Sequence, residues 1–363
     1  MKKNLVIIGA GPRGLAVALR ASIEKKYNVY VVDSNPMSSW QFPNMLPDME
    51  MRSPISFDLT TFCKDLHPYS LSSFLGNPKY YEDQEEVEAS NTYCFRLEFI
   101  KYLEYIIKIC RQNGVVFVKK LATNITDKDI MCGDTPLSYD YLVVATGKKS
   151  QHSNIPSYLR GNKVETIKSI SSRSWKKDTI TVIGSGQQSA ELVAFLALQK
   201  ARVFWALKHT PKVNQYPVPS YSNWGFTSAL GNYYRDYCVD KNSYLKRVKE
   251  WMPSITPYIN NQLNKLSYTK ILNPISTEDL EMNGYFVIAA GSQQRVELID
   301  FNFEIEKDRH VQYLPRLEKG FKSTSHPNIF FTGLLAARFD GPRQGSIISS
   351  AITAKEILDN IPT

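Results

Sequence analysis

The fold is predicted by the stretch Leu5-Val6-Ile7-Ile8-Gly9-Ala10-Gly11-Pro12-Arg13-Gly14, in which an apolar run passes directly into a glycine-rich turn. Glycine is needed where a buried strand turns sharply into a helix and the backbone must approach a pyrophosphate closely. Free N–H groups at the start of the helix then hold the phosphate charge. The stretch therefore predicts a strand, a dinucleotide-binding turn that uses Gly9, Gly11 and Gly14, and a helix over residues 15–24.

The sequence after this helix supports the same interpretation. A second strand is expected over residues 28–32, and Asp33 follows it. An acidic side chain at the end of that strand can accept hydrogen bonds from ribose hydroxyls. The alternative is that Asp33 is an ordinary turn residue.

A second copy of the pattern lies in the middle of the chain. The strand Ile180-Thr181-Val182-Ile183 leads into Gly184-Ser185-Gly186-Gln187-Gln188-Ser189, in which a serine replaces the third glycine. The next strand ends at Lys208, and a cation there fits the 2′-phosphate of NADP better than the free hydroxyl of NAD. The alternative is that Lys208 is a solvated strand end. We assign Gly184, Gly186, Gln187 and Lys208 to this second dinucleotide site.

Two dinucleotide turns in one chain predict a flavin that receives electrons from a nicotinamide, here FAD and NADPH. A chain of 363 residues is long enough for two domains. Small-residue turns close both units, and Thr146 and Gly147 in the first of them are expected to pack against FAD. The fold class is therefore α/β, with two Rossmann-like dinucleotide-binding domains. We expect an FAD-binding domain over 1–172 and 296–363, interrupted by an inserted NAD(P)H-binding domain over 173–295.

Two further helices are expected in the first domain. Residues 96–112 repeat apolar side chains at helical spacing. A final helix is expected from about 344 to 360, after a strand that ends at Gly333. The N-terminal N–H groups of that helix would face the flavin pyrimidine and stabilise the reduced ring, which adds Gly333, Gln344 and Gly345 to the FAD site. The alternative for this segment is a simple helix cap.

The net charge, the length of the apolar runs, and the spacing of the cysteines and histidines argue against several classes of protein. The net charge is +9, but the lysines are spread along the chain, so a nucleic-acid partner is not expected. No apolar run approaches the ~20 residues that span a bilayer. Five cysteines without a CxxC pair argue against a disulfide framework or a dithiol reductase and fit the cytoplasm. The histidines lack metal-ligand spacing, so no metal site is expected, and a homo-oligomer is left open.

Three blocks of sequence resemble one enzyme family. They are 45–62, the helix start Arg96-Leu97-Glu98-Phe99, and Gly184–Gln187 with the following Ser189-Ala190-Glu191. They are similar to the flavin-dependent N-hydroxylating monooxygenases, the ornithine and lysine N-hydroxylases. The resemblance implies an FAD-dependent NADPH oxidoreductase that passes oxygen from O2 to a small amine or related metabolite through a flavin hydroperoxide. We also expect Trp40 and Gln41 near the isoalloxazine ring.

The chain departs from the family at the substrate site. Phe57 stands where the family has a substrate-binding lysine, Arg52 falls on a family glutamine, and Asn223 best matches a family asparagine at the substrate site. The resemblance thus implies a pocket at the domain cleft lined by these three residues, with Trp224 nearby. Since an aromatic ring cannot pair with a carboxylate, either Arg52 supplies that cation or Phe57 forms a flat pocket for a neutral substrate. A third interpretation makes Phe57 core packing and Arg52 a surface charge.

Two other functions remain open at this point. A flavin reductase or oxidase that has lost oxygen transfer would explain the change at Phe57. A non-catalytic, flavin-bound interaction protein is compatible with the basic charge.

Overall fold

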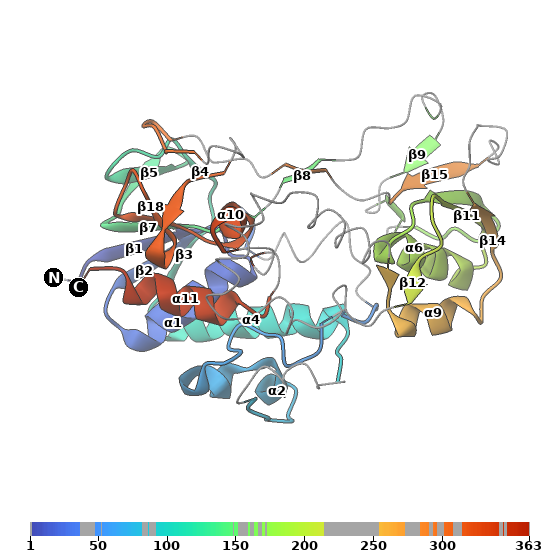
Figure 1. Ribbon diagram of the computed structural model, residues 1–363, viewed down its shortest axis with the longest axis horizontal. Helices are drawn as coiled ribbons and strands as arrows, with labels where there is room; N and C mark the ends of the chain where they lie inside the picture. The colour runs from blue at the N-terminus through green and yellow to red at the C-terminus, as the bar shows by residue number, and fades with distance from the viewer. Residues whose placement is uncertain are drawn as a thin grey trace.

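The protein contains two main β-sheets, each with its own helices (Figure 1). The computed structural model describes residues 2–36, 48–51, 53–81, 86, 92–147, 149–151, 159, 163–165, 169–170, 173–213, 254–272, 284–289, 293–295, 301–307, 314–340, 344 and 347–362. In these ranges no helix is both long enough and apolar enough to cross a membrane.

The first sheet has seven strands. In spatial order they are β17 (Leu317–Glu318), β18 (Lys322–Ser323), β19 (Ile329–Phe331), β7 (Tyr141–Val144), β1 (Asn4–Ile8), β2 (Asn28–Val32) and β3 (Val116–Val118). The strands from β19 to β3 are parallel, and β17 and β18 continue the sheet in antiparallel pairs.

Both faces of this sheet are covered, which explains why β1 is a continuous apolar run. Leu5 and Ile7 pack against the helices, whereas Val6 and Ile8 point to the other face. The helices are α1 (Pro12–Glu24), α4 (Arg96–Gln112) and α11 (Ser350–Asp359). The other face is covered by the antiparallel strands β4 (Ala122–Thr123), β5 (Asp129–Cys132) and β6 (Thr135–Ser138).

The second sheet has five parallel strands. In spatial order they are β14 (Thr269–Leu272), β11 (Arg202–Leu207), β10 (Thr179–Ile183), β15 (Tyr285–Ile288) and β9 (Lys163–Glu165). Helices α6 (Gln187–Leu198) and α9 (Pro257–Leu263) share its main core with β10, where Ile180 and Val182 are fully buried.

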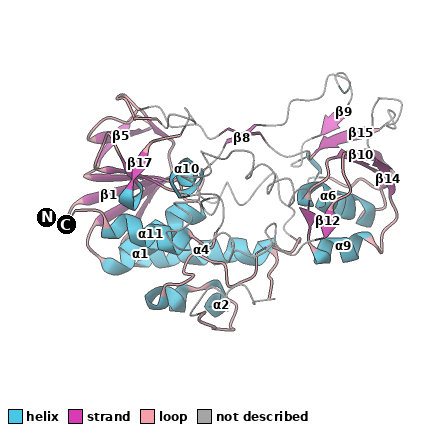
Figure 2. Ribbon diagram, in the orientation of Figure 1, coloured by secondary structure: helices cyan, strands magenta, loops and turns pink. Residues whose placement is uncertain are grey.

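Shorter elements complete the described chain. Strand β8 (Lys149–Gln151) pairs antiparallel with β16 (Gln293–Arg295), and Figure 2 shows β8 between the two sheets. Strand β12 (Lys212–Val213) pairs parallel with β13 (Ser254–Ile255). The remaining short elements are α2 (Leu71–Phe74), α10 (Ala337–Asp340), and the 3-10 helices η1 (Lys64–Tyr69), η5 (Lys319–Phe321) and η6 (Gly333–Ala336).

The α/β class is confirmed, and the helix expected over 96–112 has those bounds. The exact domain limits stay a prediction. Strand β9 belongs to the five-stranded sheet although it precedes the limit drawn at residue 172.

The start of the last helix was predicted wrongly. The structure begins α11 at Ser350, not near residue 344. Serine side chains compete with helical backbone bonds, and the Ser349 hydroxyl accepts a hydrogen bond from Arg13 at 2.6 Å.

Candidate cofactor sites at the two glycine-rich turns

The first glycine-rich turn leaves no room for a side chain at Gly9 or Gly14. Gly9 has φ +106° and donates its N–H to Val32 O at 2.9 Å. A Cβ at Gly9 would lie 2.5 Å from Ala145 O, and one at Gly14 would lie 1.9 Å from Gly9 O. Gly11 caps the start of α1. The turn therefore presents the N-terminus of α1 at the carboxyl edge of the sheet, where dinucleotides bind.

Asp33 is part of this turn. Its Oδ2 accepts the Ala10 N–H at 2.8 Å, and its Oδ1 accepts the Asn35 N–H at 2.8 Å. The carboxylate is partly buried and joins the end of β2 to the turn. The two oxygens keep further acceptor capacity, so contact with a ribose stays a prediction.

Two buried hydroxyls mark the same edge of the sheet. Thr146 follows β7 and Thr332 follows β19, and these strands are neighbours. Neither Oγ1 atom has a hydrogen-bond partner among the described residues. Buried polar atoms normally have partners, so these hydroxyls fit a site that receives polar groups of a ligand. Gly147 and Gly333 are the next residues after the two threonines.

Gln344 joins two parts of this edge. Its Oε1 accepts the Gly333 N–H at 3.1 Å, and its Nε2 donates to Asp340 at 2.5 Å and to Thr353 at 2.9 Å. The side chain is 1% exposed. It therefore holds the Gly333 turn against α11, and a direct contact with FAD stays a prediction.

Sequence reasoning missed the role of Arg13. Its guanidinium donates to Ser349 at 2.6 Å and to Thr353 at 3.3 Å, and so ties the start of α1 to α11. The available signal was a cation inside the glycine motif, but its partners lie more than 330 residues away in the sequence.

The second glycine-rich turn repeats the first in its backbone. Gly184 donates its N–H to Ala206 O at 3.0 Å, and its carbonyl accepts the Trp205 indole N–H at 2.8 Å. Gly186 caps α6, and a Cβ there would meet nothing within 4 Å. Ser189 is buried and donates to Gly186 O at 2.7 Å. A small residue therefore serves in place of the third glycine.

The end of β11 lies directly beside this turn. The Ser185 hydroxyl accepts the backbone N–H groups of Lys208 at 3.0 Å and His209 at 3.2 Å. Lys208 itself is exposed. An exposed cation next to a helix N-terminus suits a phosphate group, and its role toward NADPH stays a prediction.

The Gln187 side chain points into the protein. It is 8% exposed, its Nε2 donates to Glu191 at 2.9 Å, and its Oε1 accepts the Thr256 N–H at 2.8 Å. The part of Gln187 that remains a candidate for the cofactor is its backbone at the first turn of α6.

The structure describes one of the three predicted substrate residues. Phe57 is 1% exposed and packs with Tyr81 and Ile348, which supports the core-packing interpretation. The predicted substrate residues Arg52 and Asn223, together with Trp224, lie outside the described residues, as do the predicted FAD residues Trp40, Gln41 and Gly345.

Next to Phe57, Asp58 anchors its loop. Its carboxylate accepts the Leu71 N–H and the Thr60 N–H, both at 2.6 Å. Burial raises the pKa of Asp58, and these hydrogen bonds oppose that effect. Asp58 therefore positions the Phe57 segment against α2.

The described cysteines do not support thiol chemistry. Burial raises the pKa of Cys63 to about 11 and the pKa of Cys94 and Cys110 to about 12, so these groups are neutral thiols near pH 7. The described part of the chain also holds no cluster of three or more potential metal ligands.

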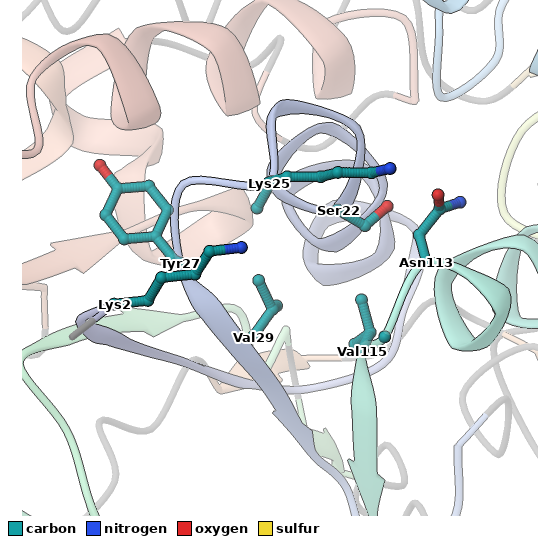
Figure 3. Close-up of a pocket in the computed structure, with 9 residues that line it drawn as sticks. Lys2, Ser22, Lys25, Tyr27, Val29, Asn113 and Val115 are labelled. Carbon is teal, nitrogen blue, oxygen red and sulfur yellow. The ribbon is translucent and has the colours of Figure 1, made fainter.

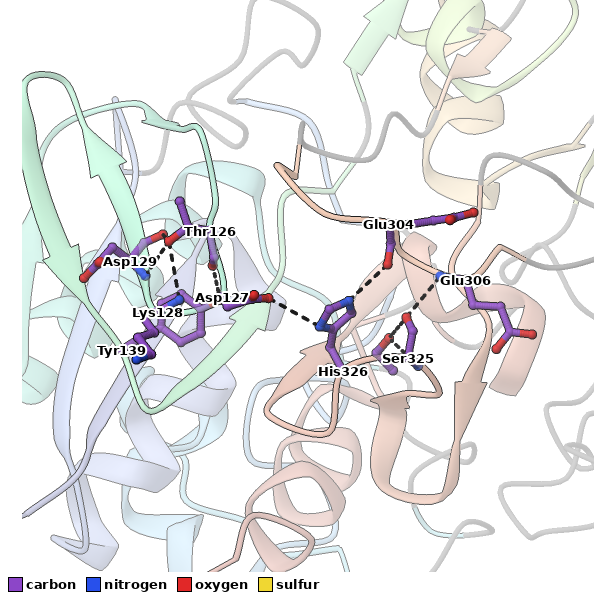
Figure 4. A network of polar contacts seen from close by, with 10 residues as sticks. Thr126, Asp127, Lys128, Asp129, Tyr139, Glu304, Glu306, Ser325 and His326 are labelled. Carbon is purple, nitrogen blue, oxygen red and sulfur yellow. Dashed lines mark hydrogen bonds and ion pairs between the residues drawn. The ribbon is translucent and has the colours of Figure 1, made fainter.

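Two polar regions lie away from the turns. A small pocket of about 100 Å³ is lined by Lys2, Lys25 and Tyr27 at the opposite edge of the first sheet (Figure 3). The second region surrounds His326, whose Nε2 lies 3.0 Å from Glu304 O and whose Nδ1 lies 3.7 Å from the Asp127 carboxylate. Figure 4 shows His326 between these two partners. The His326 contacts join the three-stranded layer to the segment 301–307.

The fold is similar to solved amine hydroxylases. The FAD-bound cadaverine monooxygenase of desferrioxamine biosynthesis from Erwinia amylovora is 17% identical, with a TM-score of 0.73, 99% of this chain covered and 94% of the other. The reduced ornithine hydroxylase from Pseudomonas aeruginosa is 15% identical, with a TM-score of 0.74 and 98% of each chain covered. The Kutzneria ornithine N-hydroxylase with reduced FAD, NADP+ and L-ornithine is 17% identical, with a TM-score of 0.73, 99% of this chain covered and 98% of the other.

At these identities the likeness establishes the fold. No curated protein sequence matches the chain. The family model described as L-lysine 6-monooxygenase/L-ornithine 5-monooxygenase matches residues 2–298 and confirms the resemblance seen in the motifs. The chain therefore belongs to the L-lysine 6-monooxygenase/L-ornithine 5-monooxygenase family.

Proposed function

We propose that this protein is an FAD-dependent, NADPH-using monooxygenase that hydroxylates the nitrogen of a small amine. The observation that carries the proposal is the pair of glycine-rich turns with matching backbone hydrogen bonds in a chain of this family. Solved relatives of the same fold contain FAD, or reduced FAD together with NADP+.

The described residues fit both dinucleotides. The turn of Gly9, Gly11 and Gly14, the Asp33 carboxylate and the Thr146 hydroxyl, which has no hydrogen-bond partner among the described residues, would hold FAD. The turn of Gly184 and Gly186, with Lys208 at the strand end, would hold NADPH. When bound, the flavin accepts a hydride from the nicotinamide and activates O2, which is chemistry that side chains do not supply. The protein contributes binding, orientation and exclusion of water.

Position 57 offers no cation for a substrate carboxylate. Phe57 is apolar and buried, so it cannot pair with a substrate carboxylate. We infer that the substrate is an amine whose recognition does not need a cation at this position. A diamine without a carboxylate, such as the cadaverine used by one solved relative, meets that condition. Arg52 stays the candidate cation for a carboxylate-bearing amine.

The test combines three measurements on the purified chain with FAD: NADPH oxidation, O2 consumption and formation of a hydroxylamine. Cadaverine, lysine and ornithine are compared, and Phe57→Lys serves as the matched variant. We expect O2 consumption coupled to hydroxylamine with at least one amine. No flavin binding, or no oxidation of NADPH, contradicts the proposal.

A second candidate function is an NADPH oxidase without oxygen transfer. The packing of Phe57 in an apolar cluster favours it, because the family's cation is missing there. Peroxide formed in proportion to NADPH, whatever amine is added, would support this second candidate.

A cytoplasmic location is part of the proposal, because the four described cysteines are free thiols.

Gel filtration tests the homo-oligomer that the sequence left open. Filter binding at two salt concentrations tests nucleic acid, for which we expect no specific affinity.

A further inference from the structure

A buried ion pair connects the helices of the two sheets. Arg96 is the first residue of α4, and Glu191 lies on α6. The guanidinium binds the carboxylate through two hydrogen bonds, Nη1 to Oε2 at 2.7 Å and Nη2 to Oε1 at 2.5 Å. The side chains are only 7% and 3% exposed. Figure 1 shows that α4 extends from beneath the seven-stranded sheet toward the five-stranded sheet.

The contacts continue from this pair to the second glycine-rich turn. Glu191 Oε1 also accepts the Gln187 side-chain N–H at 2.9 Å. Gln187 is the first residue of α6, directly after Gly186. Its Oε1 accepts the Thr256 N–H at 2.8 Å, and Thr256 caps the start of α9. A continuous polar path therefore runs from Arg96 to the turn and on to α9.

The backbone of the same arginine holds the segment that precedes Arg52. The Arg96 N–H donates to Met49 O at 3.0 Å, and the Met51 N–H donates to Cys94 O at 2.8 Å. The Met49 side chain packs in the main core of the five-stranded sheet. Arg96 thus contacts the predicted substrate segment and, through Glu191, the second turn.

We propose that Arg96 is a positioning residue that sets the second glycine-rich turn relative to the seven-stranded sheet. A buried ion pair adds little stability over an apolar pair of the same shape. The planar guanidinium does fix direction, because its two parallel donors match one carboxylate. The proposal rests on the proposed function in one respect, namely that this turn holds the nicotinamide dinucleotide.

The test uses Arg96→Met, Arg96→Lys and the double variant Arg96→Met/Glu191→Met, each purified with FAD. The control is Arg20→Met. Arg20 is also a buried arginine, but its partners Glu24 and Asp65, at 3.2 and 3.3 Å, belong to the part of the chain that surrounds the first sheet. Two readouts are taken: hydrogen exchange of the amides of 184–190 without nucleotide, and the rate of anaerobic flavin reduction by NADPH.

We expect Arg96→Met to raise exchange at the start of α6 at least tenfold and to slow flavin reduction at least tenfold, with FAD content unchanged. Arg96→Lys keeps the charge without the two-pronged contact and should recover part of the rate. The double variant should recover thermal stability but not the rate. Arg20→Met should lose stability and keep the rate.

The proposal is overturned if Arg96→Met shows the same hydrogen exchange and the same rate of flavin reduction as the parent protein. It is also overturned if Arg20→Met slows flavin reduction as much as Arg96→Met does. If Arg96→Met does not fold, the lysine and double variants decide by the same criteria. If NADPH fails to reduce even the parent protein, the proposed function fails, and the exchange readout alone still decides the positioning role.

Discussion

In the first glycine-rich turn, the Asp33 carboxylate at the strand end accepts the N–H of Ala10 in the turn. In the second, the direction is reversed, because the Ser185 hydroxyl in the turn accepts the N–H groups of Lys208 and His209 at the strand end. The first arrangement leaves a carboxylate beside the turn, and the second leaves an exposed lysine. The same backbone is thus combined with opposite charges.

The backbone hydrogen bonds of the two turns are nearly the same. Gly9 bonds to Val32 O at 2.9 Å, and Gly184 bonds to Ala206 O at 3.0 Å. On the other side of each central strand, Ala145 and Ala289 donate to the last residue of β1 and of β10 at 2.8 and 2.7 Å. Under the proposed function, the turn would hold the pyrophosphate, and the side chains at the strand end would select the rest of the dinucleotide.

The largest expected effect separates the third positions of the two turns. Gly14→Ala places a Cβ 1.9 Å from the Gly9 carbonyl oxygen, so backbone must move, at a cost of about 3 kcal/mol. Thermal unfolding and FAD absorbance should show lower stability and lost flavin. Ser189→Ala is the matched control and should cost about 1 kcal/mol, the loss of one hydrogen bond. Equal effects at both positions would contradict the close packing at Gly14.

The next test concerns the bonds between turn and strand end. Asp33→Asn weakens bonds to a charged acceptor, so we expect a loss of about 2 kcal/mol in FAD affinity, measured by titration of the apoprotein. Ser185→Ala removes neutral bonds and should cost about 1 kcal/mol of stability with FAD affinity unchanged. Unchanged FAD affinity in Asp33→Asn would remove Asp33 from the site.

Gly186→Ala sharpens the comparison by separating stability from binding. A Cβ at Gly186 meets no atom within 4 Å, so the unfolding free energy should change by less than about 0.5 kcal/mol. The added methyl group would face the pyrophosphate, and we expect NADPH to bind about tenfold more weakly, equal to about 1.4 kcal/mol. Calorimetric titration with NADP+ measures this. Parent-like affinity would mean that the pyrophosphate does not approach this turn.

The smallest expected effect belongs to the exposed cation. Lys208→Ala should lower kcat/KM for NADPH about fivefold and leave that for NADH unchanged, because surface charge pairs are weak. Lys212→Ala, another exposed lysine nearby, is the control. An equal loss with both nucleotides would assign Lys208 to something other than the 2′-phosphate.

The sequence alone determined the features that depend on neighbouring residues. Gly9 and Gly14 could be assigned to a tight strand-to-helix turn, because a side chain at either position would collide with neighbouring backbone. The helix Arg96–Gln112 could be assigned because apolar spacing reports a face that must be buried. The family could be assigned because its motifs are local blocks, and the family model supports that assignment.

Tertiary structure decided what depends on distant partners. Gln187 was predicted to bind the cofactor; its side chain is bound to Glu191 and Thr256, so its backbone is the part that remains a candidate. The last helix starts late, at a serine run where Arg13 contacts Ser349. The pairing of Arg96 with Glu191 spans 95 residues and has no signal in either segment alone. The physical reason is that a hydrogen bond or a buried contact depends on which segments lie side by side in the folded chain. Local sequence patterns do not specify which distant segments these are.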